Sequence, residues 1–155
     1  MGTERMSPGE VAKWMRDEHQ ALIDLNKVLR QHIAARPEIN LADWLRGLKV
    51  ALERLRMHLE RHFAAKEEDG YLSAVVEQRP TLSTQVEHIR REHDEILQLA
   101  EHILRDLSEV LPENRLLLAD ICARVQRFMA VVADHDQREI MITMYVFSQD
   151  IGTEG

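Results

Sequence analysis

Apolar side chains recur at alternating steps of three and four residues along four long stretches of this sequence. In the second stretch leucine occupies the first six positions of the pattern, Leu41, Leu45, Leu48, Leu52, Leu55 and Leu59, and His62 and Lys66 continue it. This spacing places the side chains on one stripe, or seam, of an α-helix, as in a helix that faces the core of a bundle. The other seams span residues 11–33, 82–107 and 118–146. The pattern therefore predicts four long helices around one core.

Prolines and helix-capping residues indicate where these helices end. Ser7, Pro8 and Glu10 form a capping box before the first helix. Asn40 is a suitable N-cap for the second helix, and Gly70 is a suitable C-terminal cap. The expected elements are helices over residues 8–35 and 41–69, a short connector helix over 71–77, a third long helix capped by Thr81 or Ser83 and ending near 110, a fourth over 113–147, and a frayed tail over 148–155.

The short connections between these helices indicate how they are arranged. Long helices joined by short loops favour an all-α fold, an antiparallel up-down-up-down four-helix bundle, here with the connector helix between helices two and three. A length of 155 residues is typical of one domain, so we expect a single domain over residues 1–155.

The charge balance and the cysteine count disfavour several classes of function. Lys and Arg number 20 against 27 Asp and Glu, a net charge of −7, which argues against a partner that is a nucleic acid or an anionic membrane. The single cysteine excludes an intramolecular disulfide and an all-cysteine metal site. No apolar run reaches the ~18 residues of a membrane span, and residues 1–10 lack the apolar region of a signal peptide. We therefore expect a cytoplasmic protein, with a homodimer left open.

Each seam carries one histidine, at positions His19, His62, His93 and His135. A single histidine on an apolar seam is usually a core residue whose ring nitrogens bind neighbouring groups. Four of them, with Glu139 one turn after His135, would leave several buried titratable groups in need of partners, at a cost of kilocalories each. A metal ion removes that cost, because imidazole and carboxylate lone pairs can bind it. No histidine has a glutamate three residues before it, so ferritin-like carboxylate sites are disfavoured. The seams thus predict an interior metal site.

These residues resemble the motifs of the hemerythrin-like proteins, also called HHE cation-binding domains. The resemblance extends over about residues 8–152. It rests, in order, on Asp17-Glu18-His19, His62-Phe63 followed by Glu67-Glu68 and Gly70-Tyr71, Glu92-His93, His135-x-x-x-Glu139 and Gln149-Asp150-Ile151-Gly152. It implies a four-helix bundle that holds a non-haem di-iron centre. Matched to the family's pattern, the ligand positions are those of His19, His62, His93, His135 and Glu139.

The sequence departs from the family's pattern at two positions. Ile89 stands where the best-known members have a second histidine on helix three. Lys66 stands where the helix-two motif His-x-x-x-Glu has a carboxylate that bridges two metal ions, and a charged ammonium has no lone pair to offer. Three arrangements are compatible with this lysine. Lys66 pairs with Glu139 in place of the second ion, a π-bulge turns Glu67 inward as a substitute ligand, or the site binds no metal and its histidines bind carboxylates.

The resemblance implies a protein that binds dioxygen, or senses oxygen or redox state, through iron. An enzyme that handles peroxide or nitric oxide would use the same ligands, whereas a structural or regulatory bundle with a degenerate site would need none. The predicted metal ligands are His19, His62, Glu67, His93, His135 and Glu139. We expect two iron ions if the family pattern holds and one if Lys66 blocks the second position. His58, one turn before His62, lies beside the seam and is not predicted as a ligand.

Overall fold

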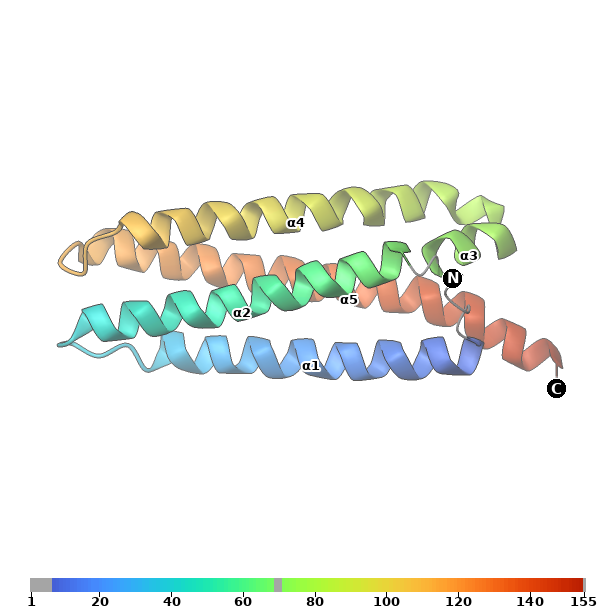
Figure 1. Cartoon of the computed structure of the whole chain (residues 1–155), viewed down its shortest axis with the longest axis horizontal. Coiled ribbons are helices and arrows are strands. Elements are labelled where there is room, and N and C mark those ends of the chain that lie inside the picture. The colour runs from blue at the N-terminus through green and yellow to red at the C-terminus, as the bar shows by residue number, and fades with distance from the viewer. Residues whose placement is uncertain (1–6, 69–70, 155) are drawn as a thin grey trace.

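The computed structural model describes residues 7–68 and 71–154, and the elements within them are all helical. They are α1 (Pro8–Ala34), α2 (Leu41–Glu68), α3 (Tyr71–Gln78), the 3₁₀ turn η1 (Pro80–Leu82), α4 (Ser83–Glu109) and α5 (Arg115–Glu154). The four long helices lie side by side along the long axis of the molecule, and α3 covers part of one end (Figure 1). Helix α1 packs against α2 and α5, and α4 packs against the same two helices.

The starts of α1 and α2 match the expected capping residues. Ser7 accepts a hydrogen bond from the Glu10 backbone N–H at 3.2 Å, as a capping box requires. Asn40 directly precedes α2 with a φ of 59°, a left-handed conformation that asparagine adopts more readily than most residues. Its carbonyl accepts from the Trp44 backbone N–H at 3.4 Å. Gly70, the expected C-terminal cap of α2, lies outside the described residues.

The predicted start of α4 and both predicted bounds of α5 need correction. Leu82 is the N-cap of α4 and makes no side-chain cap bond, so neither Thr81 nor Ser83 caps this helix. The reason is that the 3₁₀ turn begun by Pro80 leads directly into α4, and Ser83 already has helical φ and ψ angles of −58° and −39°.

Helix α5 begins at Arg115, two residues later than expected, because Asn114 accepts a hydrogen bond from the Leu117 backbone N–H at 3.2 Å and caps it. It continues to Glu154, so the expected frayed tail from residue 148 is also wrong. Residues 148–154 contain no proline, and a single glycine costs a helix only about 1 kcal/mol.

A layer of buried polar side chains divides the core into two apolar clusters. The larger cluster includes Leu22 of α1, Leu59 of α2, Ile96 of α4 and Val132 of α5. The smaller cluster, towards α3, consists of Val11, Met15, Leu72, Val75, Val86, Ile89, Val146 and Phe147. The polar side chains occupy the seam positions between the two clusters, and this placement sets the level of the candidate site.

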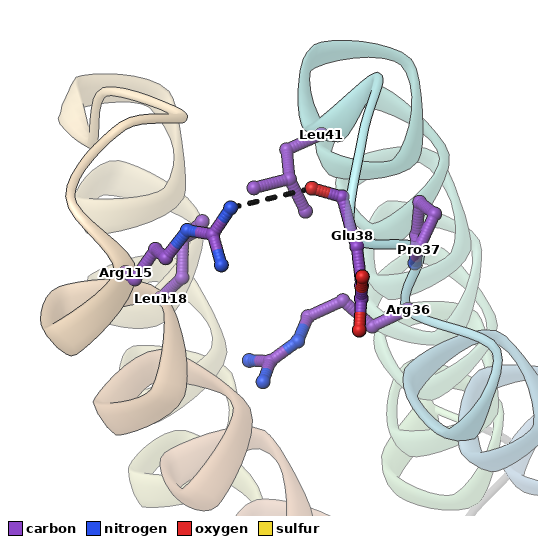
Figure 2. A pocket seen from close by; sticks show the side chains of 6 residues that line it. All are labelled: Arg36, Pro37, Glu38, Leu41, Arg115 and Leu118. Carbon is purple, nitrogen blue, oxygen red and sulfur yellow. Dashed lines mark hydrogen bonds between the residues drawn. The ribbon is translucent and has the colours of Figure 1, made fainter.

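At the opposite end of the molecule from α3, the connection between α1 and α2 lies beside the first turn of α5. Arg115 donates a hydrogen bond to the backbone carbonyl of Glu38 at 3.3 Å, across a pocket that Arg36 and Leu118 also line (Figure 2). The pocket lies beyond the end of α1, which is itself about 22 Å along the helix axis from His19. It is therefore separate from the polar layer. None of the described helices is apolar enough, over a sufficient length, to cross a membrane.

Candidate metal centre

Three side chains from α4 and α5 converge inside the polar layer, and we call them the α4–α5 cluster: His93, His135 and Glu139. The Nε2 atoms of His93 and His135 lie 3.2 and 2.9 Å from the same Glu139 oxygen, Oε2. All three residues are buried, with at most 2% of their surface exposed. His135 and Glu139 meet because residues four apart share one face of a helix. Each residue offers one ligand atom, and these atoms lie within 4.8 Å of one another.

Two carboxylates outside this cluster hold its histidine rings. The Nδ1 atom of His93 lies 3.2 Å from Glu67 Oε1, and Nδ1 of His135 lies 2.5 Å from Glu92 Oε2. Arg138 donates two hydrogen bonds to Glu92, at 2.6 and 2.8 Å, and fixes that carboxylate. A carboxylate that accepts the Nδ1 proton leaves Nε2 with its lone pair free to bind a metal. Both rings therefore direct a ligand atom at the same point.

Lys66 is fully buried and forms an ion pair with the other oxygen of Glu139, Oε1. Burial lowers the pKa of the Lys66 ammonium, although the charge of Glu139 opposes this effect. Burial also works against ionisation of Glu139, but the Lys66 charge and the neighbouring rings of His135 and His93 outweigh it and hold the pKa of that carboxyl well below its usual value. The pairing of Lys66 with Glu139 is the first of the three arrangements expected for this lysine.

Helix α2 is a regular α-helix from Leu41 to Glu68, without the π-bulge that would turn Glu67 inward. Glu67 keeps a side chain that is 43% exposed and reaches His93 only at Nδ1. Phe63 packs on the His93 ring, with the ring centroids 4.0 Å apart and an interplanar angle of 8°. The interior position on this turn of α2 thus belongs to Lys66.

A second group, which we call the α1–α2 cluster, consists of Glu18, His58 and His62. Nε2 of His58 and Nδ1 of His62 lie 3.3 and 3.2 Å from the same oxygen of Glu18. Burial lowers the pKa of both histidines, so the neutral imidazole is favoured in each. The seam analysis missed Glu18 and His58. The spacing His58-x-x-x-His62, which places both rings on one face of a helix, was the signal for His58, and no such spacing pointed to Glu18.

His19 lies apart from both clusters. Its Nδ1 pairs with the Asp136 carboxylate, and its side chain is 37% exposed. Glu18 and His19 flank the seam of α1 on opposite sides, so that Glu18 faces α2 and His19 faces α5. Of the six residues predicted as ligands, the structure brings together His93, His135 and Glu139, and it places Glu67 on the outer edge of His93 and His62 in the α1–α2 cluster.

The donor atoms of both clusters fit a transition-metal ion. Imidazole nitrogens and a carboxylate oxygen are borderline ligands that suit iron, cobalt or zinc. Several of these atoms are buried without a hydrogen bond: Nε2 of His135, Nε2 of His58, Nδ1 of His62 and Oε2 of Glu18. Buried polar atoms without well-aligned hydrogen bonds are rare and costly, and a bound cation would satisfy these. A carboxylate-bridged pair of ions does not fit, because Lys66 holds the position of the bridging carboxylate.

Comparison with known proteins agrees with this donor set. The family model described as Hemerythrin HHE cation binding domain matches residues 10–144, which is most of the chain. No curated protein and no solved structure gives a significant match. The matched range includes most of α1, all of α2 and α4, and all the residues of both clusters. This chain therefore belongs to the hemerythrin HHE cation-binding domain family.

Proposed function

We propose that this chain is an iron-binding protein of the hemerythrin type that binds dioxygen, or senses oxygen or redox state, with His93, His135 and Glu139 as the iron ligands. The observation that carries the proposal is that both imidazoles are held at Nδ1 by a carboxylate and direct Nε2 at one oxygen of Glu139. Iron, when bound, supplies redox chemistry and open coordination positions for dioxygen or another small ligand. The chain would act as one cytoplasmic domain, an antiparallel up-down-up-down bundle.

The surrounding residues would position the ligands and restrict water. Glu92, fixed by Arg138, would keep His135 in the tautomer that presents Nε2, and Glu67 would do the same for His93. Phe63 covers the face of the His93 ring and contributes an apolar wall. A dry wall of this kind tunes the affinity and redox potential of a bound metal. In this proposal Glu67 orients a ligand and is not itself one.

Lys66 would limit the α4–α5 cluster to one ion. Its ammonium neutralises the Glu139 oxygen that a second ion would need. Two unit charges ~4 Å apart interact by roughly 4 kcal/mol at an effective dielectric constant of 20, so a second cation beside Lys66 would be strongly disfavoured. The proposed centre is therefore mononuclear. This differs from the di-iron centre that the family resemblance implies.

The Lys66–Glu139 pair also favours a second candidate function, a structural or regulatory bundle that binds no metal at this cluster. An internal ammonium already compensates the Glu139 charge, and the histidines already have carboxylate partners. The two candidates differ in one measurable property, the iron content of the protein.

The test is anaerobic reconstitution with ferrous iron, followed by elemental analysis and optical spectra under air and after reduction. Replacing His93 with alanine should lower the iron content by one ion per chain and change the spectrum. His102→Ala is the matched control, because His102 is exposed on the same helix. An iron content that is the same in His93→Ala and in His102→Ala would refute this site and favour the structural bundle.

A further inference from the structure

The α1–α2 cluster has the features of a metal site of its own. Nδ1 of His62 and Nε2 of His58 both lie within 3.3 Å of Glu18 Oε2, yet none of these three atoms has a well-aligned hydrogen bond. We propose that Glu18, His58 and His62 bind a single divalent transition-metal ion, at a site separate from the α4–α5 cluster. The family pattern places ligands at neither Glu18 nor His58, so the resemblance does not supply this site.

The geometry distinguishes this cluster from an ordinary surface ion pair. The side chains of His58 and His62 are only 15% and 4% exposed, and that of Glu18 is 25% exposed. The two imidazole rings are stacked, with centroids 5.7 Å apart and an interplanar angle of 13°, so their ligand atoms lie on the same side of α2. Three converging atoms that are buried but not aligned for hydrogen bonds leave a cation as the partner that satisfies all of them.

The donor set indicates which class of ion would bind. Two imidazoles and one carboxylate suit Fe²⁺, Co²⁺ or Zn²⁺, whereas Ca²⁺ and Mg²⁺ prefer sites made only of oxygen ligands. Three protein ligands also leave coordination positions for water, as in metal sites that exchange or react. Because Glu18 and His58 retain some exposure, this site would load and release its ion more readily than the α4–α5 cluster.

Lys66 keeps the two sites separate. It follows His62 by one turn of α2 and forms an ion pair with Glu139 of the α4–α5 cluster. An ammonium with no lone pair thus stands where a carboxylate could have bridged two ions. The ions would therefore bind as two independent centres, each with two histidines and one glutamate. The α1–α2 site does not depend on the function proposed for the other cluster.

Trp14 provides a reporter for this site. Its ring stacks on the His62 ring, with centroids 5.3 Å apart and an interplanar angle of 19°. Paramagnetic Co²⁺ bound at the α1–α2 cluster should quench Trp14 fluorescence. The other tryptophan, Trp44, lies on α2 about 21 Å along the helix axis from His58, and its emission should change little. The variant Trp14→Phe should lose the fluorescence quenching by Co²⁺, which would assign that quenching to Trp14.

The experiment is a titration of the metal-free protein with Co²⁺, followed by tryptophan fluorescence, visible absorption and equilibrium dialysis. His58→Ala and Glu18→Gln should each weaken the Co²⁺ affinity reported by fluorescence more than about 10-fold, because loss of even an outer partner of a ligand weakens binding 10–100-fold. His102→Ala, at an exposed position, is the control and should leave the affinity unchanged. Circular dichroism of each variant checks that it is folded.

The outcomes separate this proposal from the function proposed above. If His93→Ala removes one equivalent of Co²⁺ and leaves the fluorescence titration unchanged, the two sites are independent as proposed. Quenching that persists in a protein whose α4–α5 cluster binds no metal would support the α1–α2 site and refute the other. Quenching that is insensitive to His58→Ala and Glu18→Gln, or that disappears in His93→Ala, would overturn the proposal of a separate site.

Discussion

Replacing Lys66 with methionine should destabilise the metal-free protein by about 3–5 kcal/mol. Both Lys66 and its partner Glu139 have no exposed surface. Methionine preserves much of the apolar stem of the lysine but removes its charge, and it leaves Glu139 as a buried charge without its cation. Removal of one partner of a buried ion pair costs about this much, because the remaining charge has been taken out of water without compensation.

A surface pair in the same helix sets the contrast. Arg46 and Asp43 also form an ion pair, but their side chains are 75% and 72% exposed, and exposed pairs contribute only about 0.2–1 kcal/mol. Arg46→Met is therefore the matched control. Urea unfolding of both variants in the presence of a chelator, followed by far-UV circular dichroism, measures the difference. A loss of 3 kcal/mol changes the folding equilibrium constant more than about 100-fold, which is well within the range of this assay.

Two further measurements identify the cause of the loss. The double variant Lys66→Met with Glu139→Leu should recover most of the stability, because apolar residues in place of a buried pair are often neutral or stabilising. Zn²⁺ at about 100 times its dissociation constant should restore about 2.7 kcal/mol to Lys66→Met, since the ion then provides the missing cation. A single variant no less stable than Arg46→Met, or a double variant as unstable as the single one, would refute this reasoning.

Other perturbations test the surroundings of the site. Glu92→Gln should weaken metal binding at the α4–α5 cluster about 10–100-fold in a chelator competition, because His135 loses the partner of its Nδ1; an unchanged affinity would contradict that role. In the metal-free protein the low pKa of Glu139 contributes stability that is present above the ordinary pKa of 4.5 and is lost as the pH falls below it. Urea midpoints measured across this pH range report the loss. In Glu139→Leu the midpoint should depend less on pH. Leu52→Ala should lower the free energy of unfolding in urea by about 2–5 kcal/mol, because Leu52 is fully buried. Val50→Ala should lower it by less than about 0.5 kcal/mol, because Val50 is 46% exposed. Equal losses in the two variants would contradict the packing of α2.

The long helices were predictable because their seams are long and regular. The bounds of α1 and α2 agree with the expected ones to within one residue, since Ser7 caps α1 and Asn40 directly precedes α2. The start of α4 was harder to predict from the sequence. Thr81 and Ser83 both have the chemistry of a cap, but the turn that Pro80 begins gives neither of them the cap position. Capping contributes only about 1 kcal/mol, so the geometry of a neighbouring turn can override it.

The site was predictable to the extent that it follows from the seams. His93, His135 and Glu139 lie on regular seams and are buried together, as is Lys66. The α1 contribution was not predictable, because successive residues of a helix point about 100° apart and either Glu18 or His19 could face α2. That choice depends on the rotation of α1 about its own axis, which three-dimensional packing sets. Glu67 was predicted as a ligand through a π-bulge, and its place at Nδ1 of His93 was not foreseen. The role of Glu92 as the partner of His135 was also not foreseen, since Glu92 belongs to a face that appears polar and solvent-exposed in the sequence.

The buried polar layer lowers the stability of a bundle of this size, so its presence points to a function. Replacement of a buried ion pair by apolar residues of similar volume is often neutral or stabilises a protein by about 1–4 kcal/mol. Leucines at the positions of Lys66 and Glu139 would extend the apolar core into this layer, so stability alone does not explain why these positions are charged. A cation-binding role explains the histidines and Glu139. On the function proposed above, Lys66 would have a distinct consequence. By occupying the bridging position with a positive charge, it would convert a layer that could hold a coupled pair of ions into one that holds ions only separately.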